Sequence, residues 1–331
     1  MRELTYIEAV REAIAEEMRR DPSVVVIGAD VEDPHGGTFK SYKGLSTEFG
    51  SDRVRNCPLS EAGFTGIGVG MAMTGFRPVV DVSFIDFATL VTDQMVNHAA
   101  KLRYMTGGQV KMPLVLRTQG GGGVSTGAQH GQMLEAWYAH IPGLIVAMPS
   151  SPQSGKGLMK SAIRNDDPVV FIGHKGMHFQ KGPVDDAEIG QGIPFGVAEI
   201  KRAGRDVTIV ALSTMVQKAL RAAGRLSAEG IEAEVIDPRT LLPLDKATIF
   251  ASVRKTHRLV VAHEAVRHGG FGGEIVASVV EKCMGDLKES PVRVAAKNLP
   301  LPFAPEMEKF VLPSEDDIAC AVRLVCGRTG G

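Results

Sequence analysis

The chain has 331 residues, and its 37 lysine and arginine residues nearly balance its 38 aspartate and glutamate residues, for a formal net charge of -1. This balance argues against a nucleic-acid-binding protein, which normally carries a basic excess, and no apolar run is long enough for a membrane-spanning helix. A chain of this length predicts two domains. The acidic, periodic N-terminal segment is unlike a signal or transit peptide, so we expect a cytoplasmic protein.

The N-terminal segment is predicted to form a helix that begins after Thr5. Thr5 and Glu8 have the spacing of a capping box, and apolar residues recur at helical spacing as far as Met18. The continuous apolar run at 24–27 is typical of a buried parallel strand. Helix-like segments such as 86–105 and 215–229 then alternate with further apolar runs at 79–84, 114–116, 144–148, 169–172, 207–212, 235–236 and 259–262. This alternation predicts an α/β fold with a mainly parallel sheet.

A stretch rich in glycine and proline interrupts the alternation between residues 174 and 205. Turn-forming residues without periodicity are typical of a connection between domains. The alternation resumes at residue 207. We therefore predict a first domain over 1–180, a linker over 181–205 and a second domain over 206–331.

The first candidate site is the segment SEAGFTGIGVG at residues 60–70, which follows the strand-like segment 54–59. It matches a dinucleotide-binding loop poorly, because the last glycine of the GxGxxG pattern is missing and the glycines lie inside the predicted helix. Helix glycines permit close packing at a cost of up to about 1 kcal/mol each relative to alanine. Glu61 begins this helix, where the helix dipole favours a carboxylate, so it is either a structural acid or a functional one.

The second candidate site is the run Gly120–Gly123, which follows the strand-like segment 114–117. The entropy cost of ordering four glycines is too high for a role in packing alone, which favours a loop that lets the backbone approach a ligand. His130 ends this segment. Its imidazole could act as an acid or base near neutral pH, or it could be an ordinary hydrogen-bonded loop histidine.

The third candidate site is the turn Phe84-Ile85-Asp86-Phe87, between the strand-like segment 79–84 and a long predicted helix. Ligands of parallel sheets bind at the carboxyl ends of the strands. An aromatic ring at this turn could therefore stack on a ligand, although filling of the core explains the spacing equally well.

These three clusters, in this order, resemble the β subunits of thiamine-diphosphate-dependent 2-oxo acid dehydrogenases. The resemblance covers essentially the whole chain and includes HIPGL at 140–144, PSSP at 149–152, KGLMKSAI at 156–163, DDPVVF at 166–171 and TLLPLD at 240–245. It implies a pyrimidine-binding domain of the thiamine-diphosphate type, followed by an α/β domain of the transketolase C-terminal type. Some segments favour acetoin or pyruvate enzymes, whereas HEA at 263–265 favours branched-chain enzymes, so the substrate stays open.

The resemblance also implies roles for individual residues. Glu61 would hydrogen-bond the aminopyrimidine ring of thiamine diphosphate and favour the tautomer that deprotonates the thiazolium carbon, a role that a raised pKa in a dry pocket would suit. Phe87 would pack on the same ring, with Ile85 as a further cofactor contact. His130 would line the substrate channel and assist transfer to the lipoyl group. A potassium site known from some members would use the backbone around Leu114, Ala162, Ile163, Asn165 and Asp167.

A division of labour between two chains follows from the resemblance. An α subunit would hold the diphosphate and magnesium through a Gly-Asp-Gly motif, which this sequence lacks. We therefore expect an α2β2 heterotetramer that acts on a 2-oxo acid or acetoin and passes an acyl group to a lipoyl acyltransferase component. Ala29 stands where the family commonly has a glutamate of a carboxylate chain between active sites, which puts that proton path in doubt or leaves it to Asp30. The run Gly120–Gly123 replaces a common Pro-Asn-Gly, so we expect an altered acceptor preference.

Three alternatives remain open at this stage. A split transketolase-like ketol transferase subunit would share the fold and the glutamate, although no phosphate-binding cluster of arginine and lysine stands out. A nicotinamide-dependent dehydrogenase is disfavoured by the incomplete GxGxxG pattern. A non-catalytic assembly subunit is disfavoured because Glu61 and His130 are both present.

Overall fold

The computed structural model describes residues 1–328, and the chain divides into two compact units. Unit 1 consists of residues 1–120 and 137–195, and unit 2 consists of residues 121–136 and the chain from Gly196 onward. This division differs from the predicted boundaries, because the segment that carries His130 belongs to unit 2. None of the described helices combines the length and apolar character that crossing a membrane requires.

Unit 1 is built on a parallel sheet whose strands lie side by side in the order β6-β7-β5-β4-β2-β3. Every neighbouring pair among these strands is parallel. The strands are β2 (Val24–Gly28), β3 (Val54–Asn56), β4 (Arg77–Val82), β5 (Val115–Gly120), β6 (Ile145–Ala147) and β7 (Val169–His174). Each of them overlaps an apolar or strand-like segment of the sequence, which confirms the predicted parallel α/β architecture.

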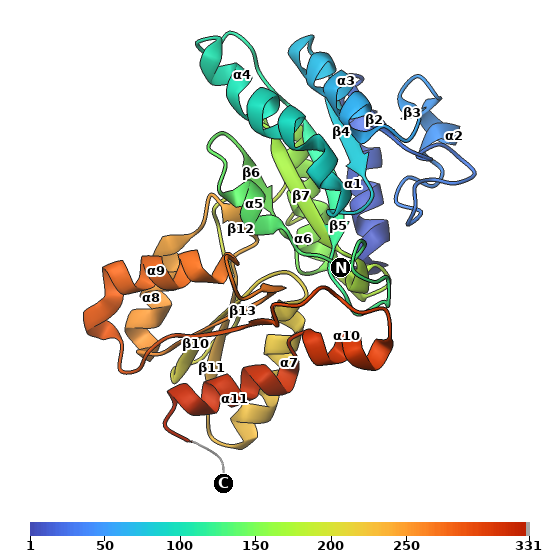
Figure 1. Ribbon diagram of the computed structural model, residues 1–331. Helices are drawn as coiled ribbons and strands as arrows, with labels where there is room; N and C mark the ends of the chain where they lie inside the picture. Colours follow the sequence, from blue (N-terminus) through green and yellow to red (C-terminus); the bar gives the residue numbers. More distant parts are fainter. Residues whose placement is uncertain (329–331) are drawn as a thin grey trace. The chain divides into compact units, whose positions relative to one another are not determined.

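Helices cover both faces of this sheet (Figure 1). Helices α1 (Tyr6–Arg20) and α6 (Pro152–Arg164) pack together over one face, where Val26 and Val79 join their core cluster. Consecutive strand residues point to opposite faces, and a Cβ atom added to Gly68 of α3 (Glu61–Met73) would lie 2.7 Å from Val80. Helix α3 therefore covers the other face, and its glycine permits that close approach.

The start of α1 agrees in detail with the sequence. Thr5 accepts a hydrogen bond from the Glu8 backbone, and the Glu8 carboxylate accepts one from the Thr5 backbone, so both halves of the capping box are present. The predicted helix over 86–105 is instead three consecutive helical segments. These are the 3-10 helix η1 (Phe87–Val91), the π-helix η2 (Gln94–Ala99) and the α-helix α4 (Ala100–Met105).

The predicted linker carries strands at both ends. Strand β8 (Lys181–Val184) pairs antiparallel with β1 (Arg2–Thr5) in unit 1, whereas β9 (Glu199–Arg202) joins the sheet of unit 2. Strand pairing satisfies backbone groups that a free linker would leave to water. Unit 1 also contains α2 (Leu45–Phe49) and η3 (Lys175–Met177), and α5 (Glu135–Ala139) spans the boundary in sequence.

Unit 2 contains a second sheet with the strand order β14-β13-β10-β11-β9, in which only β9 runs antiparallel to its neighbour. Helices α7 and α11 share a core cluster with one face, and the Thr208 hydroxyl on the other face contacts Ser252 and Thr256 of α8. The remaining elements are β10 (Val207–Ala211), α7 (Met215–Ala228), β11 (Ala233–Asp237), β12 (Thr240–Leu242), α8 (Lys246–Thr256), β13 (Leu259–Val266), α9 (Gly272–Cys283), η4 (Met284–Asp286), β14 (Val292–Ala296), α10 (Pro305–Val311) and α11 (Glu315–Val325).

Candidate active site

Glu61 is the first residue of α3, which follows β3 after a short connection. Its side chain is half-buried, and Ser60 at the N-cap makes no side-chain hydrogen bond to the helix. The position combines the carboxyl end of a parallel strand with a helix N-terminus, where ligands of such sheets bind. Glu61 is thus placed to meet a ligand, but it is in partial contact with solvent and does not lie in the dry pocket that its proposed role would suit.

The turn that precedes Phe87 lies close to the helix of Glu61. Helix η1 begins at Phe87 and packs against α3. The half-buried Phe87 ring makes an edge contact with Phe84, with the ring centroids 5.6 Å apart, and Phe84 makes another with Phe39 at 5.3 Å. Edge-to-face contacts of this kind fix ring orientation. An aromatic surface is therefore held on a turn whose following helix packs against α3.

Ile85, which is predicted as a further cofactor contact, lies in the core of this chain. Its side chain is fully buried, and its backbone N–H donates to the carbonyl of Gln119 at 2.9 Å. A side chain enclosed in this way serves the core, because it has no surface to offer a ligand that arrives from solvent. Ile85 therefore anchors the turn before Phe87 to strand β5.

The loop at 121–130, which we call the histidine loop, is closed by hydrogen bonds of its own. The Gly121 N–H donates to the Gln132 carbonyl at 3.1 Å, and the Thr126 hydroxyl donates to the His130 carbonyl at 2.9 Å. His130 is half-buried. It belongs to unit 2, whereas Glu61 and Phe87 belong to unit 1.

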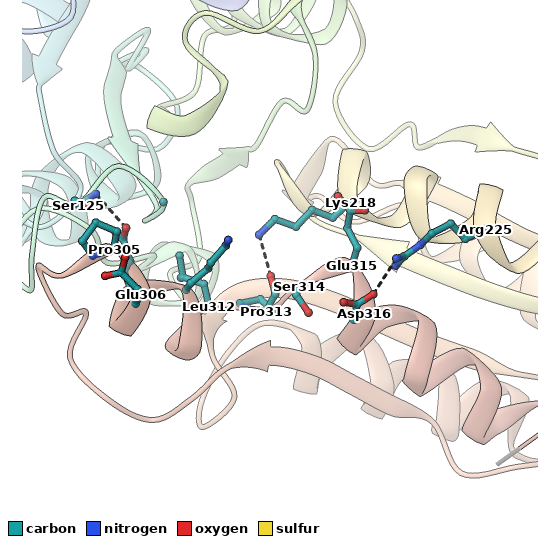
Figure 2. A pocket seen from close by; sticks show the side chains of 13 residues that line it. Ser125, Lys218, Arg225, Pro305, Glu306, Leu312, Pro313, Ser314, Glu315 and Asp316 are labelled. Atoms are coloured by element: carbon teal, nitrogen blue, oxygen red, sulfur yellow. Dashed lines mark hydrogen bonds and ion pairs between the residues drawn. The ribbon is translucent and has the colours of Figure 1, made fainter. Parts of the chain in front are cut away.

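Two buried carboxylates that the sequence did not single out contact the histidine loop. Glu264 of β13 accepts a hydrogen bond from the Gly122 N–H at 2.7 Å, and Glu308 of α10 accepts one from the Ser125 N–H at 3.0 Å. Figure 2 shows Ser125 beside the start of α10. A charged residue within a buried strand was the available signal for Glu264, whereas no pattern in the sequence marks Glu308.

A third acid, Glu135, is also fully buried. Neither of its carboxylate oxygens reaches a hydrogen-bond partner outside its own residue among the described side chains. Burial is the main cause that raises the pKa of Glu135 from 4.5 to about 7, and the negative charge of Glu264 raises it further. A carboxyl group of this kind titrates near neutral pH.

The residues of the predicted potassium site come together at one end of β5. Val169 donates its N–H to the Leu114 carbonyl, and the carbonyls of Ile163 and Asn165 both accept from the guanidinium of Arg77, at 3.1 and 2.9 Å. The carboxylate of Asp167 pairs with Arg103. Carbonyl oxygens suit a potassium ion, but a guanidinium already lies against two of them, so these residues fit the ion only in part.

The described side chains form no evident metal site. Among residues 1–328, no group of three or more His, Cys, Asp or Glu side chains is arranged to hold a metal ion.

Ala29 is half-buried, and Asp30 beside it is exposed with a left-handed backbone, at φ 56°. An exposed Asp30 is not part of a buried chain of carboxylates among the described residues.

Both units match known protein families. Residues 2–179 match the family described as the transketolase pyrimidine-binding domain, and residues 196–318 match the transketolase C-terminal domain. A split-gene transketolase described as an inactive β4 tetramer has a similar structure, with a TM-score of 0.80, 24% identity and 99% coverage of both chains. This likeness concerns the fold.

Relatives that are similar in sequence identify the family of the chain. The chain is 45% identical to pyruvate dehydrogenase E1 component subunit β-1 of Oryza sativa subsp. japonica, over 99% of this chain and 88% of the relative. It is 45% identical to the corresponding Rickettsia conorii subunit over 98% of both chains. It is also 43% identical to the β subunit of acetoin:2,6-dichlorophenolindophenol oxidoreductase of Cupriavidus necator, over 97% of both. The chain therefore belongs to the family of pyruvate and acetoin dehydrogenase β subunits, components of thiamine-diphosphate-dependent oxidoreductases.

Proposed function

We propose that this chain is the β subunit of a heteromeric dehydrogenase that cleaves the bond next to the carbonyl of a 2-oxo acid, such as pyruvate, or of acetoin. The acyl group is passed to the lipoyl domain of an acyltransferase component. The observation that carries the proposal is the placement of Glu61 at the start of α3, with the helix that begins at Phe87 packed against α3. The family relatives support the reaction class.

Glu61 and Phe87 fit the pyrimidine half of thiamine diphosphate. The cofactor supplies an electron sink for the carbanion formed by bond cleavage. Glu61 would hydrogen-bond a nitrogen of the pyrimidine ring, and an acid at a helix start that has no hydrogen-bond partner among the described residues suits that role. Phe87 would limit how the pyrimidine ring tilts, because Phe84 holds the orientation of the Phe87 ring.

A second chain completes the cofactor site in this proposal. Large apolar side chains remain exposed on and around α3, η1 and α4, namely Ile67, Met73, Leu90, Tyr104 and Met105. Exposed apolar side chains gathered on neighbouring elements mark protein interfaces. We propose that an α subunit covers this surface, removes Glu61 from solvent, and holds the diphosphate and magnesium, in an α2β2 heterotetramer located in the cytoplasm.

A potassium ion at Leu114, Ala162, Ile163, Asn165 and Asp167 is a weaker part of the proposal. The ion would have to share the Ile163 and Asn165 carbonyls with Arg77. Thermal unfolding in potassium chloride and in choline chloride of equal ionic strength tests it. A higher midpoint in potassium supports the site, and equal midpoints contradict it.

The direct test of function is Glu61→Gln in the enzyme reconstituted with its α subunit. The variant keeps the shape of the side chain but cannot share a carboxylic proton. We expect loss of cofactor-dependent turnover while the heteromer still assembles on size-exclusion chromatography. Glu281→Gln, at an exposed position of α9, is the matched control and should remain active.

Acceptor specificity separates this function from that of a ketol transferase. Acylation of a lipoyl domain supports the dehydrogenase, whereas transfer to a sugar phosphate would indicate a transketolase-like enzyme. Full activity of the Glu61→Gln variant would reject the role assigned to Glu61 and would revive the assembly-subunit alternative.

A further inference from the structure

We propose that Glu264 and Glu308 are positioning residues for the acyl-transfer step, because they hold the histidine loop in one conformation from two sides. This inference rests on the proposed function, in which His130 would assist transfer to the lipoyl group, as the family resemblance implies. Its structural part, that two buried carboxylates fix the loop backbone, can be tested separately.

The first contact fixes the glycine-rich end of the loop. Glu264 lies in the buried strand β13, and its side chain is 4% exposed. One carboxylate oxygen accepts the Gly122 N–H at 2.7 Å, and the other lies 4.0 Å from the ammonium group of Lys218. A hydrogen bond to an ionised acceptor is stronger than one between neutral groups. The backbone at Gly122 is therefore tied to the second sheet.

The second contact fixes the loop three residues later. Glu308 is 3% exposed, and one oxygen accepts the Ser125 N–H at 3.0 Å. Its other oxygen has no hydrogen-bond partner among the described residues. A buried unpartnered carboxylate oxygen is costly, and a core that needed only packing would be served better by an apolar side chain. The placement of Glu308 is explained by the loop that it holds.

A side chain at Gly122 would crowd its neighbours. A Cβ atom there would lie 2.9 Å from Leu312, 3.1 Å from the free oxygen of Glu308 and 3.2 Å from Leu301. Contacts below about 3.4 Å are tighter than ordinary van der Waals packing of carbon atoms. The glycine thus brings the loop backbone within reach of both carboxylates, which gives a specific reason for one member of the run Gly120–Gly123.

The two anchored positions lead directly to His130. The Thr126 hydroxyl donates to the His130 carbonyl at 2.9 Å, so the turn closes immediately after Ser125. Beyond the histidine, a Cβ atom on Gly131 would lie 2.7 Å from Leu301. His130 is therefore held between anchored segments on either side, and loss of either carboxylate would allow its imidazole to move by the distances that matter in catalysis.

The experiment measures loop protection and two activities in the reconstituted enzyme. Deuterium exchange is followed in peptides that cover 121–130, and turnover is followed with a lipoyl domain and with a dye as electron acceptor. The variants are Glu264→Leu, Glu308→Leu and Gly122→Ala. The matched control is Glu306→Leu, which alters an exposed acid on the same helix as Glu308.

We expect exchange in the loop to become at least tenfold faster in each variant and to stay unchanged in the control. Lipoyl acylation should fall at least tenfold more than dye-coupled turnover, because the role assigned to His130 is in transfer to the lipoyl group. Unchanged exchange in all three variants would overturn the inference. Equal loss of both activities would also overturn it, since a merely structural role affects them together.

The variant His130→Gln separates this inference from the proposed function. If His130→Gln leaves lipoyl acylation intact, the role assigned to His130 is wrong, and the positioning of that residue falls with it. If His130→Gln impairs acylation while the two glutamate variants do not, the positioning role alone is refuted. Should one glutamate variant fail to fold, Gly122→Ala tests the same contacts from the loop side.

Discussion

The stability of the Glu135→Gln variant, measured relative to that of the wild type, should be greater at neutral pH than at mildly acidic pH. Burial holds the pKa of Glu135 at about 7 in the folded chain, against 4.5 for an ordinary glutamate. Between these two values the folded state keeps a proton that the unfolded state has lost. The free energy of unfolding of the wild type therefore falls as the pH rises through this window.

The size of the effect follows from the two pKa values. One pKa unit corresponds to about 1.4 kcal/mol, so a rise from 4.5 to about 7 amounts to roughly 3 kcal/mol that the wild type loses between pH 4.5 and pH 7. Glutamine carries no titrating proton and keeps the size of the side chain. The stability difference between Glu135→Gln and wild type should thus grow by about 3 kcal/mol across this window and then level off.

Urea unfolding of the purified chain at half-unit steps from pH 4.5 to pH 8 measures this difference. Glu135→Ala is a useful companion, because it leaves a cavity that lowers stability at every pH but removes the same titration. The curves of the two variants should run parallel. Glu264→Gln should shrink the effect only in part, since burial is the larger cause. A difference between wild type and Glu135→Gln that stays constant with pH would refute the reasoning.

Four further substitutions test local contacts within unit 1. Gly68→Ala should lower the free energy of unfolding by about 1–2 kcal/mol, because its methyl group would lie 2.7 Å from a β4 valine. Gly70→Ala has open space around it and should raise the free energy of unfolding of the isolated chain by about 0.5–1 kcal/mol. Equal effects of the two substitutions in urea unfolding would contradict this. Asp81→Ala should cost about 3–5 kcal/mol, because it leaves the guanidinium of Arg117 buried without its carboxylate at 2.8 Å, and a loss below 1 kcal/mol in the same assay would argue against it. Thr5→Ala removes the helix cap and should lower the thermal midpoint through a loss of about 1 kcal/mol, so an unchanged midpoint would count against the cap.

The helices and strands could largely be predicted from patterns of neighbouring residues in the sequence. The capping box at Thr5 and Glu8 and the apolar strand segments depend on neighbouring residues, and these appear in the structure nearly where the sequence predicts them. The start of α3 at Glu61 was likewise predicted, because strand, turn and helix follow one another without interruption.

The features that sequence reasoning missed depend on contacts between distant segments. The histidine loop belongs to unit 2 because its backbone bonds to Glu264 and Glu308, more than 130 residues away in the chain. Glu135 looks like an ordinary helix-start acid until its burial is known. Burial was equally hidden for Ile85, whose side chain is enclosed in the core although the sequence places it at a strand end; its contact with a cofactor stays a prediction.

Titration calorimetry with thiamine diphosphate and magnesium measures whether this chain supplies only the pyrimidine half of a shared cofactor site. The chain alone, the α subunit alone and the reconstituted heteromer are compared, each with wild-type and Glu61→Gln β chains. We expect tight binding only for the heteromer and weaker binding when Glu61 is replaced. Tight binding by the isolated chain, or an affinity of the heteromer unchanged by Glu61→Gln, would contradict it.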